Sequence, residues 1–220
     1  MKRKLKIIGI ITALVLVFAV SVATTVAYFS DKDSMVNKFT VGNNTIEITE
    51  DFNPPNELTQ GDNVFKKAVK ISNTGNVPCY VRAFFDFSDS AIKDNAYLSA
   101  EKKSTFNADD RDWIAANAYY ANLPEGWVYI PLDDAKDALL GGYCYYVYPV
   151  QPGEETAYLF QSVNVHFEQA ENVKDFEIIV TADSVQITDK DGVSFEESGK
   201  GGWKAAWNEF LGRRDVDSNN

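Results

Sequence analysis

Short runs of alternating apolar and polar residues are the feature that most limits what this chain can fold into. From Val77 to Phe87 the odd-numbered positions form an apolar face, while positions 80 to 86 carry Tyr, Arg, Phe and Asp at the even numbers. This period of two is typical of a β-strand with one buried face. The run from Phe65 to Ser72 alternates in the same way, and the turn sequence SNTGNVP joins the two runs. We expect them to pair as a β-hairpin.

The remaining strand-like runs are separated by Gly, Asn and Pro, which favour turns. They cover residues 38–41 and 45–49 around the turn Gly42-Asn43-Asn44, and residues 142–150, 157–167 and 175–187. Aromatic residues make up 13% of the chain, and they suit pleated, half-buried surfaces. With about eight strands and no fixed repeat, the sequence predicts an all-β fold, a jelly-roll-like antiparallel β-sandwich.

Short helical segments are expected beside these strands. Residues 88–126 indicate a helical insertion between strands, with a short helix near 110–121, and the sequence DDAKDALLGG favours a further helical turn. Near the C-terminus, apolar residues at i, i+3, i+4, i+7 and i+8 predict an amphipathic helix that caps an open end of the core: Trp203, Ala206, Trp207, Phe210 and Leu211. We therefore expect one domain over residues 40–212 and a flexible tail over 213–220.

The N-terminal residues 1–27 have the three-part plan of a secretory signal peptide. A basic start ends at Lys6, an apolar run follows, and Thr25-Val26-Ala27 places small residues at a cleavage position. We expect cleavage between Ala27 and Tyr28 and export of the remaining chain. The alternative is a retained anchor, because the stretch from Lys6 to Asp31 carries no charge and is long enough to span a bilayer.

The charge of the chain limits its partners. The net charge is −11, and it becomes −15 once the four basic residues of the signal peptide are removed. Nucleic acid is therefore not an expected partner, because phosphate binding requires clustered Lys and Arg. A surface this acidic favours a soluble protein.

The residues that carry catalytic chemistry are few. His166 is the single histidine, and strand alternation places it with Asn164 and Glu168 on a solvent-facing side. A zinc peptidase of the H-E-x-x-H type needs two histidines, so we expect no catalytic residue, no metal and no cofactor. Asp189 and Asp191 lie in the sequence TDKDGVSFEE, which favours a turn, and a weak calcium site is the alternative there.

Cys79 and Cys144 are the only cysteines, and both lie in strand-like runs. Export would permit a disulfide between them. A bridge needs Cα atoms within about 7 Å of each other, and the sequence does not give that distance. Two buried thiols would therefore fit the same pattern. The sequence leaves both alternatives open.

Four blocks, in order along the chain, resemble TasA- and camelysin-type proteins. They are VAYFSDKDSMVNKFTVG, LTQGDNVFKKAVKISNTGNVPCYVRA, GGYCYYVYPVQPGEETAYLFQSVNV, and IIVTADSVQI followed by GWKAAWNEF. The likeness is weakest over residues 88–126, and Gln60 stands where the family pattern has Pro before Gly-Asp. The resemblance implies export through a dedicated signal peptidase and a jelly-roll subunit of an extracellular biofilm or surface fibre. Camelysin-like members are described as metalloproteases, but this sequence lacks the residues to support that role.

The resemblance also implies how such a fibre assembles. The mature N-terminal segment, residues 28–39, would leave its own subunit and add as a donor strand to the next one, with Tyr28, Phe29, Met35 and Phe39 as the candidate donor residues. The partner would then be the chain itself, head to tail, with minor fibre proteins as further candidates. The alternative for residues 28–37 is a flexible tail.

Two other functions remain as alternatives. The first is a monomeric adhesin or binding module, in which the aromatic residues of the insertion form a recognition face: Trp113, Tyr119, Tyr120 and Trp127. These side chains could equally pack the insertion onto the sandwich. The second, more remote alternative is a secreted hydrolase that uses His166.

Overall fold

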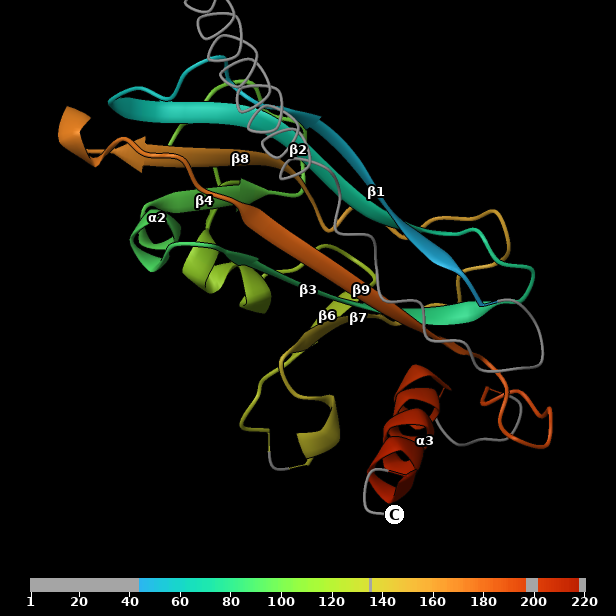
Figure 1. The fold of residues 1–220 in the computed structure, drawn as a ribbon. Coiled ribbons are helices and arrows are strands. Elements are labelled where there is room, and N and C mark those ends of the chain that lie inside the picture. The colour runs from blue at the N-terminus through green and yellow to red at the C-terminus, as the bar shows by residue number, and fades with distance from the viewer. Residues whose placement is uncertain (1–43, 135, 197–201, 218–220) are drawn as a thin grey trace, which may run out of the picture. The chain divides into compact units, whose positions relative to one another are not determined.

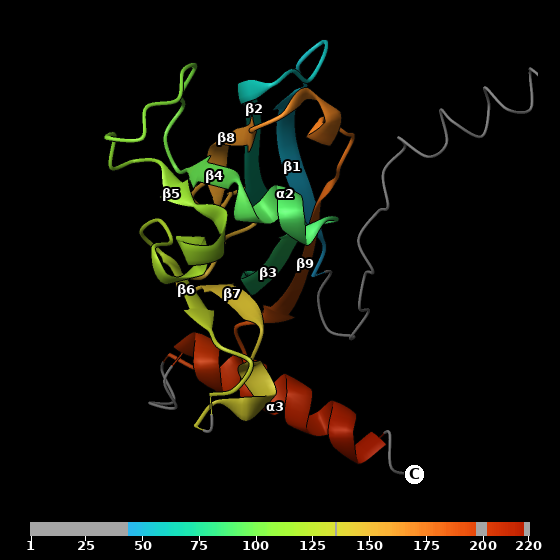
Figure 2. The same ribbon diagram turned by 90° about the vertical axis from the view of Figure 1, so that its left-hand side faces the viewer.

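The computed structural model describes residues 44–134, 136–196 and 202–217. They form two antiparallel sheets packed face to face, with the strand orders β1-β2-β8-β4-β5 and β6-β7-β3-β9 (Figure 1, Figure 2). The predicted all-β, jelly-roll-like antiparallel β-sandwich is confirmed. The strands are β1 (Ile46–Asn53), β2 (Gly61–Asn73), β3 (Cys79–Phe87), β4 (Ala96–Ser99), β5 (Ile114–Ala115), β6 (Trp127–Ile130), β7 (Tyr143–Tyr146), β8 (Phe160–Phe167) and β9 (Ile178–Gln186).

The predicted hairpin between β2 and β3 is wrong. β2 pairs with β1 and β8 in one sheet, whereas β3 pairs with β7 and β9 in the other. The chain crosses between the sheets at a corner held by Asn73, whose side-chain amide donates to the backbone carbonyls of Val77 (2.8 Å) and Val150 (2.9 Å). Two strands that each have one apolar face can lie side by side in one sheet or face each other across a sandwich. Here β2 and β3 face each other from different sheets.

The core lies between the two sheets. The predicted apolar face of β3 is confirmed, because Val81 and Ala83 are fully buried and Phe85 is 1% exposed. It packs against the inner face of the other sheet, where Ile71 and Val163 are fully buried as well. This core positions the edge strands β1 and β9, which are described below.

Residues 88–126 contain helical turns, as expected, but they also build the first sheet. They form α2 (Ser90–Asp94) and the 3-10 helix η1 (Ala116–Ala121), which replaces the longer helix expected near 110–121. Between them lie β4 and β5, and β4 pairs with β8. The description of this segment as an insertion between strands is therefore incomplete, because its short strands carry too few residues to show a period.

A helix near the C-terminus covers the outer face of the second sheet. α3 (Gly202–Asp217) places the fully buried Trp207 against Tyr80, Tyr145 and Val185 in a second apolar cluster. The predicted C-terminal helix is confirmed, with Ala206 and Trp207 on its buried side. Its predicted place at an open end of the core is wrong, because it covers the outer face of the second sheet. It continues to Asp217, so the tail expected from residue 213 is helical up to that point. The two remaining 3-10 turns are η2 (Ala138–Leu140), in the segment where a helical turn was predicted, and η3 (Ala170–Asn172).

Candidate functional site: the seam between β1 and β9

The sandwich has two sides along which the edges of its sheets lie near each other. On the side of β5 and β6, η1 covers the core: the Tyr120 ring stacks between Phe85 and Tyr129, at 4.7 Å and 4.5 Å between ring centres. Trp113, Tyr119 and Trp127 are also buried, at 6%, 1% and 4% exposure. The proposed recognition face of aromatic residues is therefore wrong, and these side chains pack the segment onto the sandwich.

The other side lies between β1 and β9. We call it the β1–β9 seam and define it by the core-facing residues of the two edge strands: Ile48, Glu50 and Phe52 on β1, and Ile178 and Val180 on β9. The strands approach each other at one end, where the Ser184 hydroxyl donates to the Asn44 side-chain oxygen at 3.0 Å. From that end they diverge (Figure 1), and Figure 2 shows both on the same side of the sandwich.

The core is incompletely covered along the seam. Ile48 and Val180 are only partly buried, although the residues opposite them in the interior strands, Ile71 and Phe85, are 0% and 1% exposed. At the wide end, the Phe52 side chain is 50% exposed while its ring lies 6.0 Å from that of Phe65. Residues opposite each other in an antiparallel pair share a face and similar surroundings in the middle of a sheet. The difference therefore marks apolar surface that is left partly exposed along this side of the sandwich.

Both edge strands also present backbone groups for pairing. Among the strands that the structure describes, β1 pairs with β2 alone and β9 with β3 alone. The outer edge of such a strand carries a row of N–H and C=O groups that can template another strand. β9 is nine residues long, enough for a full strand addition.

A charged pair lies within the seam. The Lys67 ammonium is 2.7 Å from a Glu50 carboxylate oxygen and 5.0 Å from the centre of the Phe52 ring. Lys67 is only 7% exposed. Sequence reasoning missed this pair, although one signal was there: Lys67 is in phase with Phe65 and Val69, on the apolar side of its strand.

The predicted cleavage and donor residues lie outside the described residues. These are Ala27, Tyr28, Phe29, Met35 and Phe39, together with the strand expected at 38–41. The described chain begins at residue 44, immediately before β1, so these residues precede the narrow end of the seam in sequence. Of the helices that the structure describes, none is long and apolar enough to cross a membrane.

The two cysteines are free, buried thiols. Cys144 lies opposite Ala83 in the β3–β7 pair. Cys79 is four residues from Ala83 along β3, which separates the two Cys Cα atoms by about 13 Å, roughly twice the reach of a disulfide. The two cysteines therefore form no disulfide. Burial raises the pKa of the Cys79 thiol to about 12.

His166 and its neighbours lie on the outer face of the first sheet. The His166 Nδ1 atom is 2.9 Å from an Asp62 carboxylate oxygen, which also accepts a hydrogen bond from the Asn164 amide at 3.1 Å. His166 is partly exposed, as predicted, but Asn164 is fully buried. The expectation that Asn164 faces solvent is wrong, because the loop after β4 folds over this row and donates from the Lys103 backbone to the Ser162 hydroxyl at 2.7 Å.

Comparison with known families decides which group of proteins this chain resembles. The family model described as camelysin metallo-endopeptidase matches residues 1–109, about half of the chain. The chain belongs to the TasA/camelysin family. The match spans β1 and β2, and therefore one wall of the seam with its Glu50–Lys67 pair. The search of curated proteins finds no match.

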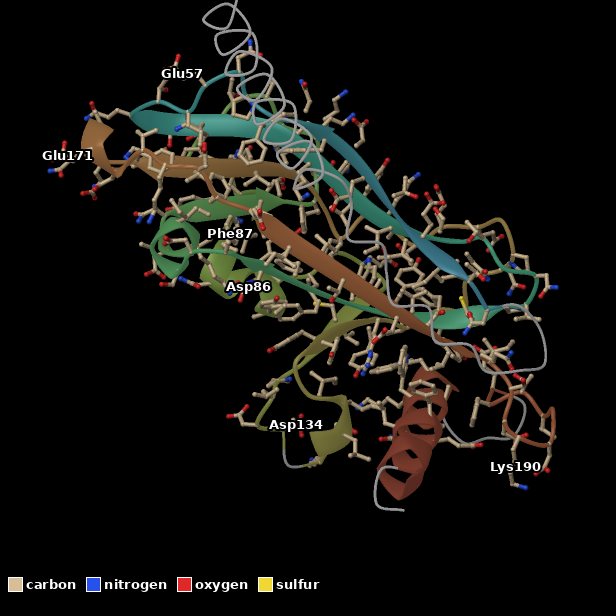
Figure 3. The ribbon with its side chains drawn as sticks, viewed as in Figure 1. Glu57, Asp86, Phe87, Asp134, Glu171 and Lys190 are labelled. Atoms are coloured by element: carbon tan, nitrogen blue, oxygen red, sulfur yellow. The ribbon has the colours of Figure 1, made fainter. Side chains whose placement is uncertain are left out.

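The camelysin description names a metallo-endopeptidase, but the donor groups of this chain do not fit a peptidase metal. A catalytic zinc takes three protein ligands, which are most often histidines with a carboxylate. This chain has one histidine, and Asp62 already accepts from both its ring and Asn164. Within the described residues, no three His, Cys, Asp or Glu side chains are placed to hold a metal ion. Figure 3 shows Asp134 far from Glu57 and Glu171, which lie toward the same end of the sandwich.

The candidate calcium loop of this camelysin-family chain is a turn. The Asp189 carboxylate accepts hydrogen bonds from the backbone N–H groups of Asp191 (2.9 Å) and Val193 (3.0 Å), and Gly192 has a φ of +79°. The Asp189 side chain therefore holds the turn together. The neighbouring Asp191 pairs with Lys190 at 2.9 Å.

Proposed function

We propose that this chain, after removal of residues 1–27, is a secreted structural subunit of an extracellular biofilm-matrix or surface fibre. Cleavage between Ala27 and Tyr28 by a dedicated signal peptidase would create a free N-terminal segment. Residues 28–39 of one copy would then add as a strand to the β1–β9 seam of the next. The observation that carries this proposal is the half-buried apolar row of Ile48 and Val180 on two edge strands, each of which pairs with a single strand among the described residues.

The physical basis is strand addition. A donated strand pairs with the free N–H and C=O groups of an edge and buries its alternate side chains. Phe29, Met35 and Phe39 are apolar and fall on one face of such a strand. Because the donor segment and the seam are different surfaces, the contact is heterologous, and it propagates into a filament when its rotation does not close a ring.

The proposed role is structural and not enzymatic. It is supported by the donor set around His166, which lacks the ligands of a peptidase metal. Replacing His166 by Ala should leave fibre formation unchanged. If the purified chain cleaves a peptide substrate and the His166→Ala variant loses that cleavage, the structural proposal would be wrong on this point.

The test compares two forms of the chain. A protein that begins at Tyr28 should form filaments visible by electron microscopy, and a protein that begins at Thr40 should stay monomeric, because it lacks the donor segment. Light scattering across a range of concentrations checks the same point in solution. Filaments from the shorter form, or a mature form that stays monomeric at all concentrations, would contradict the proposal, and the latter would favour a monomeric binding module.

A further inference from the structure

The Glu50–Lys67 pair points toward the core of the sandwich. In the β1–β2 pair, Glu50 lies opposite Val69 and Phe52 lies opposite Lys67. Residues opposite each other share a face, as do residues two apart on one strand. Val69 is fully buried in the core, so Glu50 projects from the same face, between Ile48 and Phe52, and Lys67 lies on that face opposite Phe52. The Glu50 side chain remains 32% exposed.

Both ions of this pair need polar neighbours in any strand that covers them. An ammonium group has three N–H donors, and a carboxylate has only acceptors. Covering the pair with an apolar side chain would remove solvent without replacing its hydrogen bonds, which is costly for charged groups. A primary amide can serve both ions, because its oxygen accepts from the ammonium group and its nitrogen donates to the carboxylate.

The segment proposed as the donor carries one amide with the matching spacing. In a strand, Phe29, Met35 and Phe39 share a face with the residues at positions 31, 33 and 37. On that face, Asn37 is the only polar residue with an apolar residue two positions away on each side. The order of Met35, Asn37 and Phe39 repeats the apolar, polar, apolar order that β1 presents in the seam.

We propose that the Asn37 amide of one copy binds the Glu50–Lys67 pair of the next copy, and that this contact selects the strand which the seam accepts. Met35 and Phe39 then lie on either side and pack against the apolar residues that flank the pair. The inference rests on the proposed function and names the register of its donor strand. Registers that place Asp31 or Asp33 at the pair bring a second carboxylate toward Glu50, which like-charge repulsion opposes.

The experiment uses the chain that begins at Tyr28 and measures the critical concentration for filament formation by light scattering. The Asn37→Ala variant should raise that concentration about tenfold to hundredfold, since hydrogen bonds to two charged groups are lost. Ser34→Ala, on the opposite face of the strand, is the matched control and should leave it unchanged. Both positions lie outside the described residues, and thermal unfolding of all three proteins is the control that separates a loss of assembly from a loss of stability.

A second pair of variants tests the bridging role itself. Asn37→Asp should weaken assembly by about tenfold or more, because the new carboxylate still meets Lys67 but faces Glu50. Adding Glu50→Gln to that variant should restore assembly, because the carboxamide can donate to the new carboxylate.

The outcomes separate this inference from the fibre proposal. If the chain that begins at Tyr28 forms filaments and Asn37→Ala assembles like the unmodified chain, the inference is overturned while the fibre proposal stands. A loss of assembly in Asp33→Ala but not in Asn37→Ala would also overturn it, because that result assigns another residue to the pair. If the unmodified chain forms no filaments, both proposals fail.

Discussion

Replacing Arg82 by Leu should loosen the attachment of α3 to the second sheet. The Arg82 side chain is 6% exposed, and its Nε and Nη2 atoms donate to one Asp183 carboxylate oxygen at 3.0 Å and 2.8 Å. Its guanidinium carbon lies 3.9 Å from the centre of the Tyr143 ring and 4.5 Å from that of Trp207. This cation therefore joins β3, β7 and β9 to the helix.

The expected loss follows from these contacts. Removing one partner of a buried ion pair costs about 3–5 kcal/mol, and the lower end applies here because the Asp183 side chain is 26% exposed. Two stacking contacts with aromatic rings add about 0.5–1 kcal/mol each. The apolar packing of the new Leu offsets roughly 1 kcal/mol of this sum. We expect the free energy of unfolding to fall by about 3 kcal/mol.

Denaturation in urea, followed by tryptophan fluorescence, measures this loss, since α3 carries two tryptophans. Arg82→Leu combined with Asp183→Asn should recover part of it, because the second change removes the carboxylate that the first leaves without its cation. A loss below about 1 kcal/mol, the value typical of an exposed pair, would refute the reasoning. So would a double variant that is less stable than Arg82→Leu alone.

Two further predictions concern backbone strain and the thiols. Gly126→Ala should cost about 2–3 kcal/mol of stability, because Gly126 has a φ of +87° and an added Cβ would lie 2.6 Å from the Tyr146 ring. Gly153→Ala is the control and should cost about 1 kcal/mol, because Gly153 has a φ of +80° but open space around it among the described residues. Equal losses in thermal unfolding would show that the contact has no effect. Cys79 and Cys144 should react with a thiol reagent only after denaturation, and then as two thiols per chain; fewer would indicate a bridge. Burial raises the pKa of the Cys79 thiol to about 12 from its ordinary 9.0. The folded chain therefore holds this proton more tightly than the unfolded chain. The stability that this difference contributes is complete below pH 9 and is lost as the pH rises toward 12. The unfolding midpoint should therefore fall less steeply above pH 9 in Cys79→Ala.

The faces of the long strands could be predicted from the sequence because alternation reports burial directly. In β3, Val81 and Phe85 face the core as the alternation predicts. Tyr80 and Arg82 on the opposite face are buried as well, because α3 covers them, and alternation does not show this. The pairing of strands could not be predicted, because an apolar face is satisfied equally by a neighbour in the same sheet or by the opposite sheet. The four residues of β4 show no period of two, and only their pairing with β8 and β5 identifies them as a strand.

Side chains that are polar and yet buried were the other limit of sequence reasoning. The sequence predicted that Asn164 faces solvent, because it alternates with Val163 and Val165. It is fully buried, and the segment after β4 binds the same face of the strand at Ser162. Lys67 keeps the apolar phase of its strand, so its inward position was visible in the pattern. Its ion pair with Glu50 was not, because the alternation alone does not give the register in which β1 pairs with β2.

The two sides of the sandwich show how the chain distributes its covering segments. Residues 88–126 close the side of β5 and β6 with η1 and its aromatic stack, and α3 is held on the outer face of the second sheet by Arg82. Neither segment covers the β1–β9 seam. An exposed edge strand is a liability that proteins often control with inward-pointing charges, and the Glu50–Lys67 pair places two charges beside β1, an edge strand among the described residues. An ion pair that disfavours apolar strands and binds a strand with a matching amide would let the seam accept the donor strand of another copy and exclude most other strands.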